Sequence, residues 1–264
     1  FDELLIGLLG HELRNPLSAV LLSAGFLERE TALNPIQSRF LMRILHTSRR
    51  MARLVNDLLD FVRIRMGDGL PIRIEPIDLE VWAIGVMEEL RITHPSRMIQ
   101  IEARGDLKGV WDPDRLTQMM LNLVANALKH GAVNHPVQVT IEGQGDHVGL
   151  SVHNEGNTIP AQELPTLFGA FQQGDTAYAR RATSGGLGLG LFVVEQIVVA
   201  HGGQIQVNSR DGEGTTFQIF LPRDTAGQNA MPIVSRGGGQ TPSPAVNDQR
   251  AFWERADADR KSSS

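Results

Sequence analysis

Two neighbouring residues near the start of the chain could carry out group transfer. They lie in the segment His11-Glu12-Leu13-Arg14-Asn15-Pro16. A histidine with a pKa near 6.5 is mostly neutral at pH 7 and therefore nucleophilic, and the carboxylate of Glu12 could accept its second ring proton. The simpler interpretation is a solvent-facing histidine on an ordinary helix. Pro16 makes that interpretation less satisfactory, because it removes a backbone donor inside a strongly periodic helix beside the histidine.

A second group of polar residues follows one face of a predicted helix. Asn122, Asn126 and Lys129 recur at positions i, i+4 and i+7, away from the apolar residues of the same segment. Amide oxygens are hard, neutral ligands that suit a Mg²⁺ ion shared with phosphates, and a lysine adds positive charge for the phosphates. The alternative is a polar helix surface. Since asparagine is a mediocre helix former, two of them one turn apart favour a site.

Glycines open a later helix. Residues 184–191 read Ser-Gly-Gly-Leu-Gly-Leu-Gly-Leu, and glycines before a helix N-terminus form an anion site, because free N–H groups and the helix dipole both favour phosphate. The spacing is not that of a dinucleotide fingerprint, and a flexible hinge is the alternative. A turn at 154–160 also follows a predicted strand. There Gly156 permits close backbone approach, and the amide of Asn154 could bind a purine edge. The alternative is an ordinary turn.

Composition narrows the classes of function. The 264 residues carry a formal net charge of −5 and a pI of about 5.9, which argues against a nucleic-acid-binding surface. The lack of cysteine excludes disulfides, cysteine-ligated metals and thiol nucleophiles. No run approaches the roughly 18 apolar residues of a membrane helix. The first residues read as the middle of an amphipathic helix, so we expect a missing upstream part. We expect this piece to be cytoplasmic, and membrane-attached only through an anchor in that part.

Hydrophobic periodicity divides the chain into four parts. Residues 1–66 show two apolar stripes of helical spacing, which predict a two-helix hairpin that completes its core as a dimeric four-helix bundle. Glycine and proline mark a linker at 67–77. Residues 78–223 predict an α+β fold with a mixed, mostly antiparallel sheet and helices on one face. Residues 224–264, rich in Gly, Pro and Ser, predict a disordered tail.

The predicted elements of the third part alternate in type. Helical patterns lie near 79–91, 113–130, 161–173 and 188–201, and strand-like runs lie at 99–103, 137–142, 147–153, 204–209 and 215–221. Gly-Asp and Asp-Gly pairs between adjacent strands predict antiparallel hairpins.

Together these stretches resemble the sequence boxes of the sensor histidine kinases of two-component systems. Residues 11–16 resemble the H box and 122–130 the N box. The two glycine boxes correspond to 154–160 and 186–191, and Leu167-Phe168-Gly169-Ala170-Phe171 resembles the F box. The resemblance covers residues 1 to about 223 and rests on the order and spacing of all five boxes. It implies a dimerisation and phosphoacceptor hairpin followed by a Bergerat-type ATP-binding domain, an α/β sandwich.

The resemblance also implies a role for each matching residue. His11 would accept the γ-phosphate of ATP, Glu12 would act as the base, and Asn15 would position water when the same protein dephosphorylates its partner. Asn126 would bind Mg²⁺, and Asn154 would face the adenine amine. The other nucleotide-binding positions would be Asn122, Lys129, His130, Gly156, Arg180, Arg181, Gly186, Gly188, Gly190 and Leu191. Residues 174–184 would form the mobile lid over the triphosphate.

The implied activity is ATP-dependent autophosphorylation of His11. The phosphate would then pass to an aspartate of a response regulator receiver domain, and phosphatase activity would act in the reverse sense. The kinase would be a homodimer formed through residues 1–66, with no nucleic-acid partner. A Bergerat-fold ATPase of the chaperone or repair kind is an alternative, but such an ATPase does not need the hairpin that carries His11.

Several residues depart from the family pattern. Asn154 stands where the first glycine box usually has aspartate, and Thr158 replaces a glycine there. Gly169-Ala170 stands in for the usual Glu-Pro of the F box. These departures leave open a degenerate, non-catalytic dimerisation and interaction module. The amide at position 154 together with Leu187 also resembles kinases joined to phytochrome-like photosensors.

Overall fold

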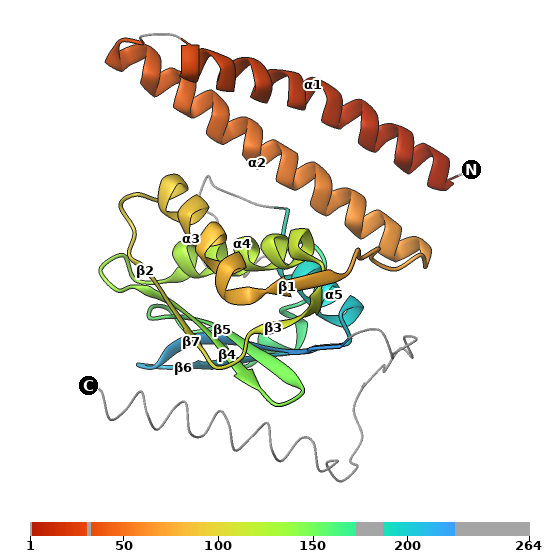
Figure 1. Cartoon of the computed structure of the whole chain (residues 1–264), viewed down its shortest axis with the longest axis vertical. Coiled ribbons are helices and arrows are strands. Elements are labelled where there is room, and N and C mark those ends of the chain that lie inside the picture. Colours follow the sequence, from red (N-terminus) through yellow and green to blue (C-terminus); the bar gives the residue numbers. More distant parts are fainter. Residues whose placement is uncertain (1, 31–32, 173–186, 225–264) are drawn as a thin grey trace. The chain divides into compact units, whose positions relative to one another are not determined.

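The computed structural model describes residues 2–30, 33–172 and 187–224, and for residues 2–14, 30 and 46 it describes the backbone alone. The predicted lid, and the predicted tail from residue 225 onward, lie outside the described residues. The chain begins with two long helices, α1 (Asp2–Glu30) and α2 (Pro35–Met66), which pack as the predicted hairpin (Figure 1).

The start of α2 is fixed by a capping box. The Asn34 side-chain oxygen accepts hydrogen bonds from the Ile36 N–H at 3.0 Å and the Gln37 N–H at 2.9 Å. The Gln37 side chain in turn accepts from the Asn34 N–H at 3.0 Å. Pro35 suits the first helical turn because its missing N–H has no partner there in any case. At the other end, Gly67 closes the helix in the left-handed region, with φ 95°.

The hairpin packs on one apolar face and leaves another exposed among the residues that the structure describes. Its buried cluster consists of Ala24, Leu41 and Leu45. Much of the stripe predicted for the second helix is exposed instead: Ile36 is 62%, Phe40 57%, Ile44 48% and Met51 51% exposed. An exposed apolar row of this kind is typical of a surface that another protein covers. None of the helices in the described part of the chain is long and apolar enough to cross a membrane.

The second part of the chain is built on a five-stranded sheet. Its strands, in sheet order, are β2 (Ile99–Arg104), β4 (Val137–Gln144), β5 (His147–Asn154), β7 (Gly214–Pro222) and β6 (Gln204–Arg210). β2 and β4 are parallel and the other pairs antiparallel. Helices α3 (Leu79–Thr93), α4 (Pro113–His130) and α5 (Gly190–Ala200) pack on one face (Figure 1). The predicted mixed sheet with helices on one face is confirmed.

Three short elements differ from the prediction. β1 (Glu75–Asp78) and β3 (Lys108–Trp111) form a separate two-stranded antiparallel sheet that was not predicted. β1 overlaps the end of the segment predicted as a linker, residues 67–77, and extends one residue beyond it. The predicted helix at 161–173 is wrong: only Leu164–Thr166 is helical, as a single 3₁₀ turn. The chain then leaves helical geometry, and Phe171 has a left-handed backbone with φ 61°.

Candidate functional site

Helix α4 carries the predicted asparagine face. Asp112 caps the helix, since its side chain accepts from the Arg115 N–H at 3.0 Å. On the core side, four residues are at most 1% exposed: Leu116, Met119, Leu123 and Ala127. Asn122 and Asn126 are half-buried on another face, and Lys129 is exposed near the end of the helix. The helix therefore holds two amide groups, one turn apart, beside its packed face.

The end of α4 is joined to the turn that follows β5. Gly131 and Gly156 form an isolated antiparallel bridge. Gly156 has φ 145°, and a Cβ there would lie 2.7 Å from the carbonyl oxygen of His130, so only glycine fits. The bridge brings the first glycine box against the asparagine helix. Asn154, only 4% exposed, lies at the end of β5 beside this junction.

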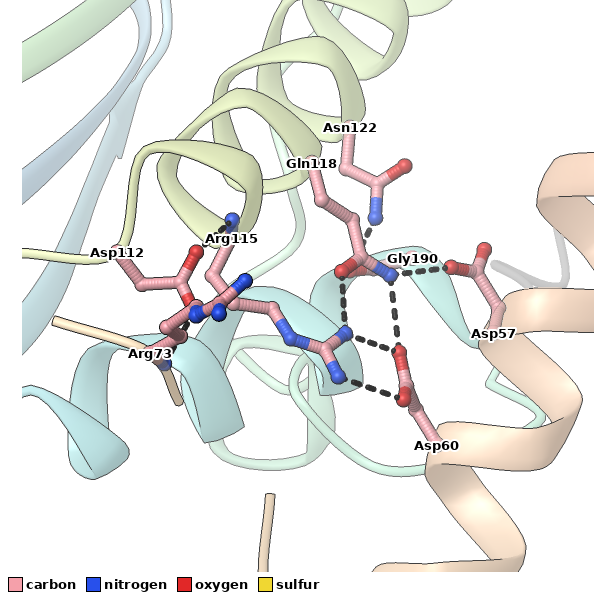
Figure 2. A network of polar contacts seen from close by, with 8 residues as sticks. All are labelled: Asp57, Asp60, Arg73, Asp112, Arg115, Gln118, Asn122 and Gly190. Carbon is pink, nitrogen blue, oxygen red and sulfur yellow. Dashed lines mark hydrogen bonds and ion pairs between the residues drawn. The ribbon is translucent and has the colours of Figure 1, made fainter. Parts of the chain in front are cut away.

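The second glycine box meets the same helix from another side. Gly188 has φ 71°, and a Cβ there would lie 2.8 Å from the carbonyl oxygen of Gln172, the residue that follows the F box. Gly190 is the first residue of α5, and the half-buried Leu191 follows it. The Asn122 side chain donates a hydrogen bond to the Gly190 carbonyl oxygen at 3.4 Å (Figure 2). The structure thus brings together three of the predicted boxes.

The electrostatics at the helix ends suit an anion. Leu189, which precedes α5, supplies no side-chain cap, and the first turn of α5 has no acidic residue. The N–H groups of that turn therefore point out of the helix without such a partner. At the end of α4, partial desolvation lowers the pKa of the His130 imidazole, and the charge of Lys129 adds to the effect. His130 is therefore neutral at pH 7.

The described residues do not form a metal site of clustered histidine and carboxylate side chains. In residues 15–29, 33–45, 47–172 and 187–224 no group of three or more His, Asp or Glu side chains could hold a metal ion. A divalent cation at this site would be bound by amide oxygens and by the oxygens of its own ligand.

Two comparisons with known families fit this geometry. Residues 111–225 match the family described as histidine kinase-, DNA gyrase B-, and HSP90-like ATPase, and residues 3–67 match the His Kinase A (phospho-acceptor) domain. The second match decides among the proteins that share the ATPase fold, because it contains His11. The chain belongs to the sensor histidine kinases. The expected family and fold are confirmed.

This histidine kinase is similar to curated proteins over most of its length. It is 36% identical over 221 residues to the bacteriophytochrome of Pseudomonas aeruginosa, and 33% identical over 237 residues to the circadian input-output histidine kinase CikA of Synechococcus elongatus. These matches cover 83% and 86% of the chain, but only 29% and 31% of the two relatives. The kinase therefore spans less than a third of each. The first match agrees with the predicted likeness to phytochrome-linked kinases.

A solved structure matches at the level of the fold and the sequence. Full-length ShkA in complex with AMPPNP has a TM-score of 0.60 and 28% identity to the kinase. The match covers 82% of this chain and 45% of that one.

Several predicted site residues of the kinase lie in α1 or outside the described residues. His11 and Glu12 lie within α1, but their side chains are outside the described residues. Asn15 is exposed one turn after His11, and the helix continues through Pro16. Arg180, Arg181 and Gly186 also lie outside the described residues. The roles of all these residues remain predictions.

Two hydroxyl residues beside Asn154 were not predicted. Thr215 lies opposite Asn154 in the pairing of β5 with β7, and its hydroxyl is 2.7 Å from that of Ser209. The Ser209 hydroxyl also accepts from the Ile159 N–H at 2.9 Å. These contacts tie the first glycine box to β6. Only strand register places Thr215 there, and the sequence offered no signal for it beyond the Asp-Gly turn nearby.

A polar network that the sequence did not predict joins the hairpin of the kinase to α4 (Figure 2). The Arg115 guanidinium donates to both oxygens of Asp60, at 2.7 and 3.2 Å. The Gln118 amide donates to Asp57 and to Asp60, each at 3.1 Å. The two carboxyl groups are 8% and 6% exposed. Burial raises the pKa of Asp57 to about 6; the Gln118 hydrogen bond opposes this shift and the Asp60 charge adds to it.

The network borders a cavity and an aromatic cluster. The cavity measures about 610 Å³ and is lined by α2, α4 and the segment between α2 and β1. Phe61 of α2 contacts Phe171 and Phe192 edge to face, with ring centroids 4.9 and 5.6 Å apart. Phe171 is the F-box residue with the left-handed backbone, a strained conformation for a bulky side chain. The end of the F box therefore packs on the hairpin.

Proposed function

We propose that the chain is the catalytic core of a protein-histidine kinase that binds Mg-ATP and transfers the γ-phosphoryl group to His11. The observation that carries the proposal is the convergence of the asparagine helix and the second glycine box, joined by the contact from Asn122 to Gly190. The same chain carries a match to a phospho-acceptor domain that includes His11.

The residues of the site fit a Mg-nucleoside triphosphate. Two amide groups, Asn122 and Asn126, offer neutral oxygens of the kind that Mg²⁺ prefers when phosphates supply the remaining ligands. Glycine at 188 lets the chain pass close to the backbone of Gln172, Gly190 lies against Asn122, and the uncapped first turn of α5 supplies N–H donors for phosphate. The exposed Lys129 adds a positive charge nearby. We assign Mg²⁺ binding to Asn126, with Asn122 beside it.

Each acting residue has one task in the transfer. One imidazole nitrogen of His11 attacks the γ-phosphorus, the bond from that phosphorus to the bridging oxygen breaks, and ADP leaves with the bond's electrons. Glu12 accepts the proton from the other ring nitrogen, so that the phosphorylated imidazole does not carry an uncompensated positive charge. The phosphoryl group then moves to an aspartate of a receiver domain.

Asn154 is assigned to the adenine. It is buried at the end of β5, and its side-chain nitrogen donates to the Glu155 carbonyl oxygen at 3.4 Å. The amide oxygen is then the atom directed to accept from the adenine amine.

We also propose a homodimer through residues 1–66. Support comes from the exposed apolar row on α2, which the single chain does not cover.

The helix position of Asn15, one turn from His11, supports a role in orienting water for phosphatase activity. We expect the segment to act in the cytoplasm, where ATP and receiver domains are available.

The test is phosphorylation by radiolabelled Mg-ATP. The unmodified chain should gain an acid-labile, alkali-stable label, and His11→Gln should gain none. His147→Gln, at the first residue of β5, is the matched control and should be labelled normally. Asn126→Ala should lose labelling although the hairpin is intact.

A non-catalytic module gives a different result in calorimetry. The proposed kinase should bind ATP in a Mg-dependent way, and the module should not. Retention of label by His11→Gln would also exclude the proposed acceptor.

A further inference from the structure

A buried histidine outside the predicted site joins the two helices that form it. His201 follows α5 directly and is 0% exposed. One ring nitrogen, Nδ1, lies 2.8 Å from the Ile197 carbonyl oxygen, and the other, Nε2, lies 3.0 Å from the backbone nitrogen of Asp112. The first partner can only accept and the second can only donate. Both contacts are hydrogen bonds in one state alone, the neutral imidazole that carries its proton on Nδ1.

The contact of His201 with Asp112 links α5 to α4. Asp112 caps α4, so the bond from its N–H to His201 joins the beginning of α4 to the end of α5. In the middle of α4, Asn122 donates to Gly190, the first residue of α5. The eleven residues from 112 to 122 and the twelve from 190 to 201 each span about 15–17 Å as helix. Segments 112–122 and 190–201 are therefore antiparallel, similar in length and hydrogen-bonded to each other at both ends.

Hydrogen bonding distinguishes this histidine from a residue that only fills the core. A leucine or phenylalanine would fill the volume without a partner for the Asp112 N–H, and a buried donor left without a partner is costly. Burial lowers the pKa of His201, and the Asp112 and Arg115 charges facing the ring act in opposite directions. The imidazole is neutral at pH 7, as the contact requires.

We propose that His201 is a positioning residue of the nucleotide site. By holding Asp112, it fixes the register of α4 against α5, and with it the place of Asn122 and Asn126 opposite the glycines at 188 and 190. The proposal rests on the proposed function, because it presumes that this site binds Mg-ATP. A displacement of about 1 Å between such elements is enough to weaken a site strongly.

The test measures Mg-ATP binding by titration calorimetry for two variants. His201→Leu removes the acceptor, and its dissociation constant should rise roughly tenfold, as is typical when a supporting hydrogen bond behind a ligand is lost. His201→Gln offers an amide oxygen to the Asp112 N–H and should regain most of the affinity. Leu90→Ala, in the core of α3 and away from both contacts, is the control for lost stability.

The pH dependence of Mg-ATP affinity supplies a second readout. A side chain that only filled the core would not change it. An imidazolium has no acceptor, so the affinity of the unmodified chain should fall relative to that of His201→Gln as pH decreases. Because burial lowers the pKa of His201, this fall should lie on the acid side of the ordinary histidine pKa of about 6.5. Subtracting the two curves removes the titration of ATP itself and of other groups near the site. This comparison holds even where His201→Leu does not fold.

The outcomes separate the inference from the function on which it rests. One outcome would contradict the inference alone. In it, the unmodified chain binds Mg-ATP, and His201→Leu loses no more affinity than Leu90→Ala when the two variants are compared at equal loss of melting temperature. Parallel pH curves for the unmodified chain and His201→Gln would also contradict it. Absence of Mg-dependent binding by the unmodified chain would contradict the proposed function as well.

Discussion

Asn154 places a neutral amide where a carboxylate is usual in the family. Its side chain is almost completely buried, and its nitrogen is engaged by the Glu155 carbonyl oxygen. The remaining oxygen can accept from an amine, but a neutral acceptor forms a weaker hydrogen bond than a charged one. In the role proposed for it, the residue would keep the preference for adenine and lower the strength of the contact.

Replacing this amide by a carboxylate should strengthen nucleotide binding. Asn154→Asp is expected to lower the dissociation constant for Mg-ATP about fivefold, which is the effect of roughly 1 kcal/mol from a charge-assisted hydrogen bond. Titration calorimetry at pH 7 measures it. Asn157→Asp adds the same charge at an exposed position of the same turn and should change the affinity little. Equal effects of the two variants would show that net charge, and not the hydrogen bond, is responsible.

At the scale of elements, the sequence predicted best where local signals coincide. The bounds of α4 follow from a capping aspartate, a proline in the first turn and an unbroken apolar period. β1 and β3 have four residues each, too few for a period to be recognised. The pairing of Asn154 with Thr215 depends on the register of β5 against β7. The hydrogen bond between Asp112 and His201 joins residues 89 positions apart. No local sequence pattern predicts either of these two contacts.

Two glycines in separate elements should respond oppositely to an added methyl group. In β3, a Cβ on Gly109 would overlap the ring of the fully buried Trp111, whose N–H is fixed by the Pro222 carbonyl oxygen at 2.8 Å. Gly109→Ala should therefore lower the free energy of unfolding by about 1–3 kcal/mol. Gly85 in α3 has open space around it, and Gly85→Ala should raise that free energy by about 0.5–1 kcal/mol. Urea denaturation compares them. A stable Gly109→Ala would show that Trp111 can move.

At the scale of the molecule, the contact between α2 and α4 is mainly polar. It consists of two buried carboxyl groups facing one guanidinium and one amide, with an aromatic contact beside it. Buried ions recover their hydration when such a contact opens, so a contact of this kind is more easily reversed than an apolar one. In the proposed reaction, ATP and a receiver domain must reach the same imidazole in turn. A reversible contact between hairpin and ATPase domain suits that requirement.

The buried carboxyl group of Asp57 should make the stability of this contact depend on pH. Its pKa is about 6 in the folded chain and near 3.9 when unfolded. Between these values the folded state binds more protons than the unfolded state. The contribution of Asp57 to the free energy of unfolding is therefore greatest below about pH 4, and it decreases as pH rises to about 6.

Asp57→Asn isolates this effect, because an amide keeps the acceptor for Gln118 and does not titrate. Urea unfolding from pH 4 to 7 should show the variant more stable than the unmodified chain by about 1–3 kcal/mol above pH 6, with the difference disappearing towards pH 4. Subtracting the curves removes shared contributions, including that of His201. Asp68→Asn, at an exposed position after α2, should follow the unmodified chain. If the curve of Asp57→Asn also ran parallel to that of the unmodified chain, the Asp57 carboxyl group would be hydrated, and α4 would not cover α2 in solution.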